Sequence, residues 1–249
     1  MALEKSTWRW DSKHLGVGVG VDVARWGRGG RALLLFPTAG GDFEESERFH
    51  MLDVLEPIVA SGRCRVYSCD SVAGRVWIDG ESGGAKRATT QLAFDRFVAE
   101  ELAPAIAQDG GGGDLLVAGA SIGAFEALAA IARHPELFAA AICMSGTYDL
   151  TRWMDGEHTL DFHYASPLHF LPTLGASRQL DDLRRRFVVL ATGSGDYEAP
   201  WESWRVGRVL GEKGVPNRVD DWGKDWRHDW VTWRAMLPKY VDELLTKVG

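Results

Sequence analysis

The sequence lacks any apolar run of about 20 residues, the length that a transmembrane helix needs. Its opening, MALEKSTWRWDSKHL, contains no apolar core of the signal-peptide type. An excess of basic residues is also missing, because the formal net charge is −7, which argues against general nucleic-acid binding. We therefore expect a cytoplasmic protein that binds neither membranes nor nucleic acids.

Cysteine is scarce, and the chain has no internal repeat and no long linker. The three cysteines, Cys64, Cys69 and Cys143, show no spacing typical of a metal site, so we expect buried, reduced thiols. A chain of 249 residues without a linker predicts one domain spanning residues 1–249.

Short apolar runs alternate with longer amphipathic ones, which predicts an α/β fold with a mostly parallel central sheet and helices on both faces. Residues 7–10 and 15–24 alternate with period two and predict an N-terminal antiparallel hairpin. The segment 147–184 is rich in Trp, Tyr, His and Pro without a strong period, and is a candidate for a cap inserted over a site. The buried strands are expected at 31–36, 64–70, 115–120, 138–146, 185–193 and 215–222, and long helices at 43–60, 89–107 and 229–246.

The segment Gly119-Ala120-Ser121-Ile122-Gly123 has the pattern Gly-x-Ser-x-Gly at the point where an expected strand becomes a helix. Two glycines without Cβ atoms allow a sharp turn, which would lift the Ser121 hydroxyl clear of the backbone as a nucleophile. The N–H of Ile122 would then point from the helix start toward an oxyanion. A chance match in a Gly/Ala-rich core segment would explain the same five letters.

A nucleophilic serine needs a base and an acid, which follow it along the chain in the order acid, then histidine. His228 comes after the last expected strand and before the last helix, where such a base belongs. Asp196, in "GSGD", follows the penultimate expected strand and is the predicted acid. Glu198, Asp220 and Asp221 are rival candidates for the acid, and a turn-forming role also explains an aspartate after glycine.

The loop "FPTAGGD" at 36–42 follows an early strand and is the predicted source of the second oxyanion donor. Ala39 and Gly40 are the candidates, since the glycines permit main-chain N–H groups to face the site. A plain glycine turn between a strand and a helix explains the same letters.

These residues together resemble the esterase D-like branch of the α/β-hydrolase superfamily, the "Putative esterase" family that includes S-formylglutathione hydrolases, feruloyl esterases and mycolyltransferases. The resemblance rests on "GASIGA", "GSGD" and above all "RHDWVTWRAMLPKYV", with further similarity in "YASPLHFLPTL" and "VYSCDSVAGRVW". Two departures stand out. Many relatives have His-Gly where this chain has Pro37-Thr38, and many have Gly where it has Arg227 before the histidine.

The resemblance implies an α/β-hydrolase fold and a serine esterase that cleaves a small carboxylic ester through an acyl-enzyme. Ser121 would be the nucleophile, Asp196 the acid and His228 the base, with Ile122 and Ala39 as oxyanion donors. No metal or organic cofactor is expected. An acyltransferase or thioesterase with the same triad and a non-catalytic binding module are the competing functions, and whether the chain forms a homo-oligomer stays open.

Overall fold

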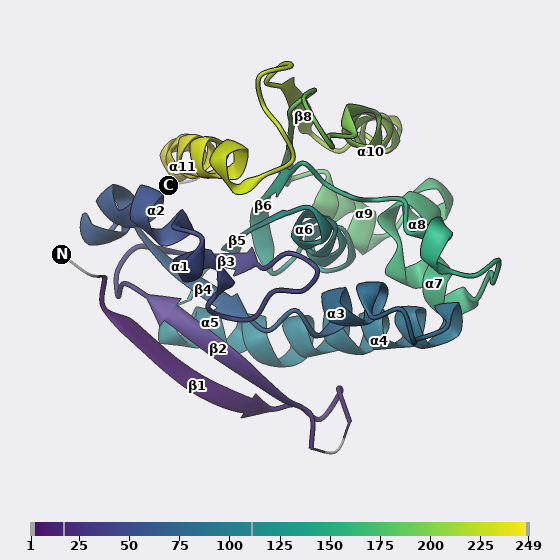
Figure 1. The fold of residues 1–249 in the computed structure, drawn as a ribbon, viewed down its shortest axis with the longest axis horizontal. Coiled ribbons are helices and arrows are strands. Elements are labelled where there is room, and N and C mark those ends of the chain that lie inside the picture. The colour runs from purple at the N-terminus through teal and green to yellow at the C-terminus, as the bar shows by residue number, and fades with distance from the viewer. Residues whose placement is uncertain (1–2, 17, 111, 248–249) are drawn as a thin grey trace.

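The computed structural model describes residues 3–16, 18–110 and 112–247. Within these ranges, eight strands form one sheet in the order β1-β2-β4-β3-β5-β6-β7-β8 (Figure 1). Strands β4, β3, β5, β6, β7 and β8 are parallel to their neighbours in this order. The strands are β1 Lys5–Asp11, β2 Gly20–Trp26, β3 Arg31–Phe36, β4 Cys64–Cys69, β5 Leu115–Ala120, β6 Phe138–Met144, β7 Phe187–Thr192 and β8 Asn217–Asp221.

The N-terminal hairpin is confirmed. β1 pairs antiparallel with β2 from Lys5 opposite Trp26 to Asp11 opposite Gly20, and β2 pairs antiparallel with β4. The hairpin therefore extends one edge of the parallel sheet, and its far end projects beyond the body of the molecule (Figure 1). The α/β-hydrolase architecture expected from the sequence is the one observed.

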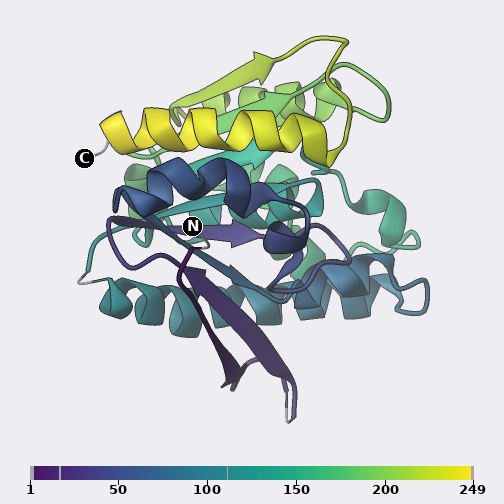
Figure 2. The ribbon, with the colours of Figure 1, turned by 60° about the vertical axis from the view of Figure 1, so that its left-hand side comes forward.

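Helices cover both faces of the sheet. On one face α2 (Met51–Ala60) and α11 (Trp230–Lys247) lie side by side over a core that includes Leu55, Ile142 and Leu237 (Figure 2). The other face carries the larger core, built around helix α6. Its helices are α3 Val72–Ile78, α4 Gly84–Phe97, α5 Ala103–Asp109, α6 Ile122–Arg133 and α10 Pro200–Glu212.

Two long helices expected from the sequence are interrupted. The helix expected at 43–60 divides into α1 (Glu45–Arg48) and α2, because His50 adopts the left-handed conformation with φ 61°. The helix expected at 89–107 begins earlier, at Gly84, and contains a π-helical turn, η1 (Val98–Leu102), before α5. Pro104 has no N–H to bond the preceding turn, which is a physical reason for this irregularity.

The segment 147–184, expected as a candidate cap, forms four short helices beside the sheet. They are η2 Thr151–Trp153, α7 Leu160–Ala165, α8 Pro167–Thr173 and α9 Arg178–Leu183. Helix α7 packs against α4, and α8 packs against α6 and α10. The segment is therefore continuous with the core of the larger face.

All three cysteines are buried and unpaired. Burial raises the pKa of the Cys64 and Cys143 thiols to about 12, so both stay protonated at neutral pH. In the part of the chain that the structure describes, no helix has the length and apolarity needed to cross a bilayer.

Strand β5, helix α6 and the end of β3 meet at two glycines. A Cβ at Gly119 would collide with the carbonyl of Gly123, and a Cβ at Gly123 would collide with the carbonyls of Phe36 and Pro37. Only glycine therefore allows the strand, the helix and the loop after β3 to approach this closely. This contact places Ser121 beside the loop that follows β3.

We expect Gly123→Ala to lower the free energy of unfolding by about 2 kcal/mol, because the added methyl overpacks a backbone contact. Gly211→Ala in α10 is the matched control, since a Cβ there meets no atom within 4 Å. It should be neutral or stabilising by up to about 1 kcal/mol. Urea unfolding of both variants checks this, and equal stability of the two would contradict the packing argument.

Candidate active site

Ser121 lies between β5 and α6 in a strained main-chain conformation, with φ 57° and ψ −119°. A non-glycine residue in such a region costs on the order of 1–3 kcal/mol, which the surrounding structure must offset. Its N–H donates to the carbonyl of Met144, and its carbonyl accepts from Ala124 and Thr147. These bonds hold the turn from both sides and leave the half-buried side chain at the carboxyl end of the sheet.

Three main-chain N–H groups, in the loop after β3 and at the start of α6, have no acceptor within the part of the chain that the structure describes. Among the described residues, the N–H groups of Ala39, Gly40 and Ile122 donate no hydrogen bond. Ile122 is the first residue of α6, where the N–H groups have no partner within the helix. Such groups are suited to stabilise a developing negative charge.

The loop that carries Ala39 and Gly40 is anchored by a buried carboxylate. Glu45 accepts the main-chain N–H and the hydroxyl of Thr38, each at 2.7 Å, although its residue is only 5% exposed. Burial raises the pKa of Glu45, and the two hydrogen bonds from Thr38 oppose that rise. Thr38 is thus the residue that ties the loop to α1.

The same loop is held from the opposite side by α3. The carbonyl of Gly41 accepts from the N–H of Ser71 and from the guanidinium of Arg75. Gly74 allows α3 to approach the loop, since a Cβ there would press against Ala39. The loop is therefore fixed in place by contacts with two helices.

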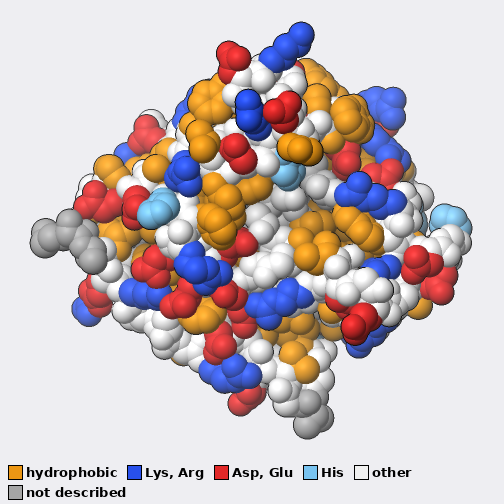
Figure 3. Space-filling view, in the orientation of Figure 1, with side chains coloured by type: hydrophobic (Ala, Val, Ile, Leu, Met, Phe, Trp, Pro, Cys, Tyr) orange, Lys and Arg blue, Asp and Glu red, His pale blue; other side chains and the backbone are white. Residues whose placement is uncertain are grey.

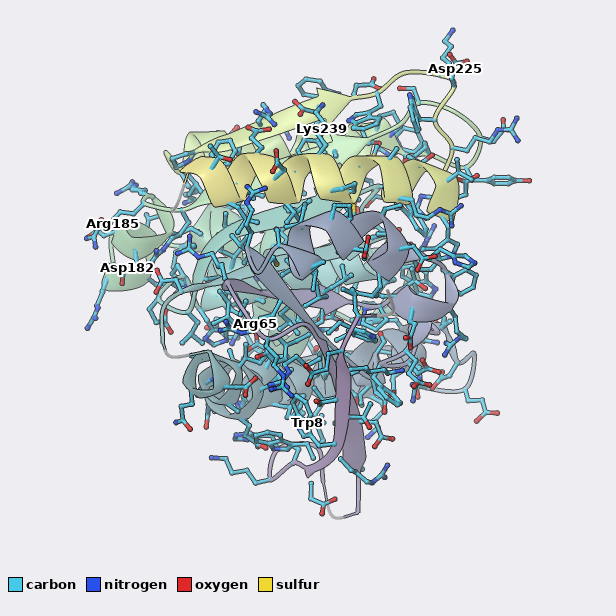
Figure 4. The ribbon with its side chains drawn as sticks, turned by 90° about the vertical axis from the view of Figure 1, so that its left-hand side faces the viewer. Trp8, Arg65, Asp182, Arg185, Asp225 and Lys239 are labelled. Carbon is cyan, nitrogen blue, oxygen red and sulfur yellow. The ribbon has the colours of Figure 1, made fainter. Side chains whose placement is uncertain are left out.

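His228 lies in the loop between β8 and α11, whose tip carries Asp225 away from the body of the molecule (Figure 4). This loop pairs with the loop after β7: the N–H of Gly195 donates to Trp226, and the N–H of His228 donates to the main-chain oxygen of Asp196. Asp229 then caps α11 by accepting the N–H of Thr232 at 3.0 Å. His228 is consequently held between a loop pairing and a helix start.

The carboxylate that faces His228 belongs to Glu198. The His228 Nδ1 lies 3.9 Å from Oε2 of Glu198, whose side chain is 1% exposed. Glu198 also accepts the hydroxyls of Ser145 at 2.5 Å and Thr192 at 3.2 Å. Burial opposes ionisation of Glu198, but the neighbouring His228 and Ser145 hold the pKa of this carboxyl below its ordinary value. A carboxylate is therefore present at neutral pH.

Ser145 and Trp233 form a hydrogen-bonded chain that ends on the carboxylate of Glu198. The indole N–H of Trp233 donates to the Ser145 hydroxyl at 3.0 Å, which directs the Ser145 proton toward Glu198. The Trp233 ring also packs edge-on against the imidazole of His228, with ring centroids 5.1 Å apart. Trp233 thus contacts His228 directly and Glu198 through the Ser145 hydroxyl.

The carboxylate expected from the sequence, that of Asp196, lies elsewhere. Its side chain is 65% exposed and forms an ion pair with Arg227 at 3.4 Å. Asp196 contributes to the site through its main-chain oxygen, which accepts the N–H of His228. Arg227 therefore pairs with a carboxylate that points into solvent.

Two further carboxylates near the end of β8, those of Asp220 and Asp221, also have partners away from His228. Asp220 accepts the Tyr240 hydroxyl at 2.9 Å, and Asp221 accepts the Ser194 hydroxyl at 2.7 Å. Of the four acidic residues that the sequence offers as the acid, Glu198 is thus the one whose carboxylate faces the imidazole.

Ser121, His228, Ala39 and Ile122 line one cavity of about 290 Å³, whereas Gly40 is not part of its lining. The structure thus brings together four of the six site residues expected from the sequence and leaves the side chain of Asp196 in solvent. The remaining wall comes from α3, from the loop after β6, from the 147–184 segment, from the loop after β7 and from α10: Ile78, Ser145, Gly146, Thr147, Arg152, Trp153, Tyr197, Ala199 and Glu202.

Sequence reasoning did not single out Glu45, Ser145 or Trp233. Glu45 carries one usable signal, an acidic residue at the start of a helix just after the candidate oxyanion loop. No sequence signal distinguishes Ser145 and Trp233 from ordinary residues of a strand end and a helix face. Their roles depend on contacts over 53 and 88 residues of chain.

We expect Glu45→Ala to lower kcat about 10- to 100-fold with little change in KM, because a loosened loop would misplace the N–H of Ala39, the expected oxyanion donor, whose effect is confined to the transition state. Glu45→Gln should retain most of the activity, since its amide oxygen can still accept from Thr38. Steady-state kinetics on a neutral ester checks this. Equal kcat in wild type and Glu45→Ala, or an effect confined to KM, would contradict the anchoring role.

Comparison with known proteins places this chain in a family. The family described as "Putative esterase" matches residues 58–244. None of the curated proteins matches the sequence.

Solved structures with the same fold cover the whole chain. A ferulic acid esterase is 19% identical with a TM-score of 0.74, and the match covers 100% of this chain and 99% of that one. An S-formylglutathione hydrolase from Agrobacterium tumefaciens is 9% identical with a TM-score of 0.73, covering 98% and 95%. The fluorophosphonate-binding serine hydrolase F of Staphylococcus aureus is 13% identical with a TM-score of 0.71, covering 98% and 99%. The chain belongs to the "Putative esterase" family of ester hydrolases and has the α/β-hydrolase fold.

Proposed function

We propose that the enzyme cleaves its ester through an acyl-enzyme on Ser121, with His228 as the base and Glu198 as the acid. The observation that carries the proposal is the cavity lined by both Ser121 and His228, behind which the buried Glu198 faces the imidazole. The separation of 3.9 Å is longer than a hydrogen bond, and such contacts commonly tighten when substrate binds.

In the first step His228 takes the proton of Ser121 as Oγ forms a bond to the ester carbonyl carbon. The carbonyl oxygen becomes an oxyanion, which the N–H groups of Ile122 and Ala39 stabilise. The ester C–O bond then breaks, and His228 gives its proton to the departing alcohol. The acyl group remains on Ser121.

In the second step water attacks the acyl-enzyme while His228 removes its proton. The tetrahedral intermediate collapses, the bond to Ser121 breaks and the serine recovers its proton from His228, which releases the carboxylic acid. Glu198 accepts from the protonated Nδ1 throughout and stabilises the imidazolium without itself taking the proton. Its lowered pKa supports this role, because it keeps the carboxylate charged next to the imidazolium.

We expect a fluorophosphonate probe to form a single covalent adduct on the tryptic peptide that carries Ser121, with loss of fluoride, because only an activated serine displaces that group. Mass spectrometry of digested protein checks this. Ser121→Ala is the control and should carry no adduct. An adduct on another serine, or none on a folded protein, would refute the assignment of the nucleophile.

We expect Glu198→Gln to lower kcat about 10²- to 10⁴-fold, because a neutral amide does not stabilise the imidazolium. Asp196→Asn should change kcat less than about threefold, since it retains the main-chain oxygen that accepts the His228 N–H. Steady-state kinetics of the two variants decides between the carboxylates. The reverse result, an active Glu198→Gln and an inactive Asp196→Asn, would restore Asp196 as the acid.

A further inference from the structure

One arginine lines the cavity that contains Ser121 and His228. Arg152 belongs to η2, and its guanidinium carbon lies 3.9 Å from the ring centroid of Trp153, which lines the same cavity. Stacking occupies the flat face of a guanidinium and leaves the N–H groups at its edge available, in a fork that fits a carboxylate. The stacking thus holds the Arg152 guanidinium in an orientation in which its N–H groups can bind an anion.

The turn that carries Arg152 is fixed at both ends. At its start, Oε2 of Glu202 accepts the main-chain N–H groups of Tyr148 and Asp149. At its end, the guanidinium of Arg87 donates to the carbonyl of Trp153 at 2.6 Å. A binding group mounted on a rigid turn needs little reorganisation when a ligand arrives.

The positive charge of Arg152 is not neutralised by a neighbour. Across residues 3–16, 18–110 and 112–247, its guanidinium forms no hydrogen bond and no ion pair. The nearby carboxylates have other partners: Glu202 accepts the two N–H groups, and Asp149 pairs with Arg205 at 2.6 Å. Acidic and basic side chains are mixed over the face in Figure 3, and the net charge is −7. Any attraction for an anion in the cavity would therefore come from Arg152 itself and not from a broad basic surface.

We propose that Arg152 selects esters that carry a carboxylate near the scissile bond. This inference rests on the proposed function, because it assigns the substrate class of that same site. A cavity of about 290 Å³ suits one small ester in which the carboxylate lies a few bonds from the carbonyl attacked by Ser121. The carboxylate can lie on the acyl half or on the alcohol half of the ester, and suitable test substrates distinguish these two cases.

The test uses two matched pairs of esters. In the first pair the charge lies on the alcohol half: para-acetoxybenzoate is compared with neutral para-acetoxybenzamide. In the second pair the charge lies on the acyl half. The para-nitrophenyl monoester of adipic acid, which has a free carboxylate, is compared with the para-nitrophenyl ester of adipic acid monoamide, which is neutral. The measured quantity is the ratio of kcat/KM for the anionic member to kcat/KM for the neutral member.

We expect wild type to prefer the anionic member of one pair, and Arg152→Gln to lower that ratio about tenfold. Arg152→Lys should give an intermediate ratio, since an ammonium keeps the charge without the fork. The preference should also weaken as salt is added, because the guanidinium is exposed. Arg178→Gln, which removes a 92%-exposed arginine on α9, is the matched control and should leave the ratio unchanged.

The same ratio in wild type and Arg152→Gln for both pairs would overturn the proposal and leave Arg152 as a solvated arginine that covers Trp153. Failure of the proposed function looks different. It would appear as no turnover of the neutral members together with no fluorophosphonate adduct on Ser121.

Discussion

The close contact among β5, α6 and the end of β3 is the constraint on which the site depends. Gly119 and Gly123 remove the two Cβ atoms that would separate these elements, and Ser121 takes up the resulting strain in its backbone. The surrounding packing offsets that strain, because α6 is buried along almost its whole length. One contact therefore presents the serine, the first N–H of α6 and the loop after β3 at the same end of the sheet.

A second constraint is the pairing between the loop after β7 and the loop before α11. Main-chain hydrogen bonds join Gly195 to Trp226 and His228 to Asp196. With the two loops paired in this way, the side chain of Asp196 points outward into solvent. The side chain of Glu198, two residues later, points inward and is buried against the imidazole of His228. A buried carboxylate requires compensation, which comes from the Ser145 and Thr192 hydroxyls and from His228.

In the specificity that we propose, the segment 147–184 supplies the residue that selects the substrate. It contributes Thr147, Arg152 and Trp153 to the cavity, while its helices pack against the same core as α6. Ser121 lies at a strand–helix junction of the central sheet, whereas these three residues of the cavity wall come from a segment outside the sheet. Such a division allows the chemistry and the specificity of one fold to change separately.

The sequence by itself determined the α/β fold, the N-terminal hairpin and the strand–turn–helix setting of Ser121, because hydrophobic periodicity and glycine spacing are local properties of the chain. It also singled out His228 as the candidate base, because His228 lies between the last expected strand and the last helix. Only the tertiary structure shows that the carboxylate of Glu198, and not that of Asp196, faces the imidazole of His228. These residues are two positions apart in one loop, and which of them is buried depends on hydrogen bonds to a loop about 30 residues further on. The same reason applies to Ser145, whose partners Glu198 and Trp233 lie 53 and 88 residues further along the chain.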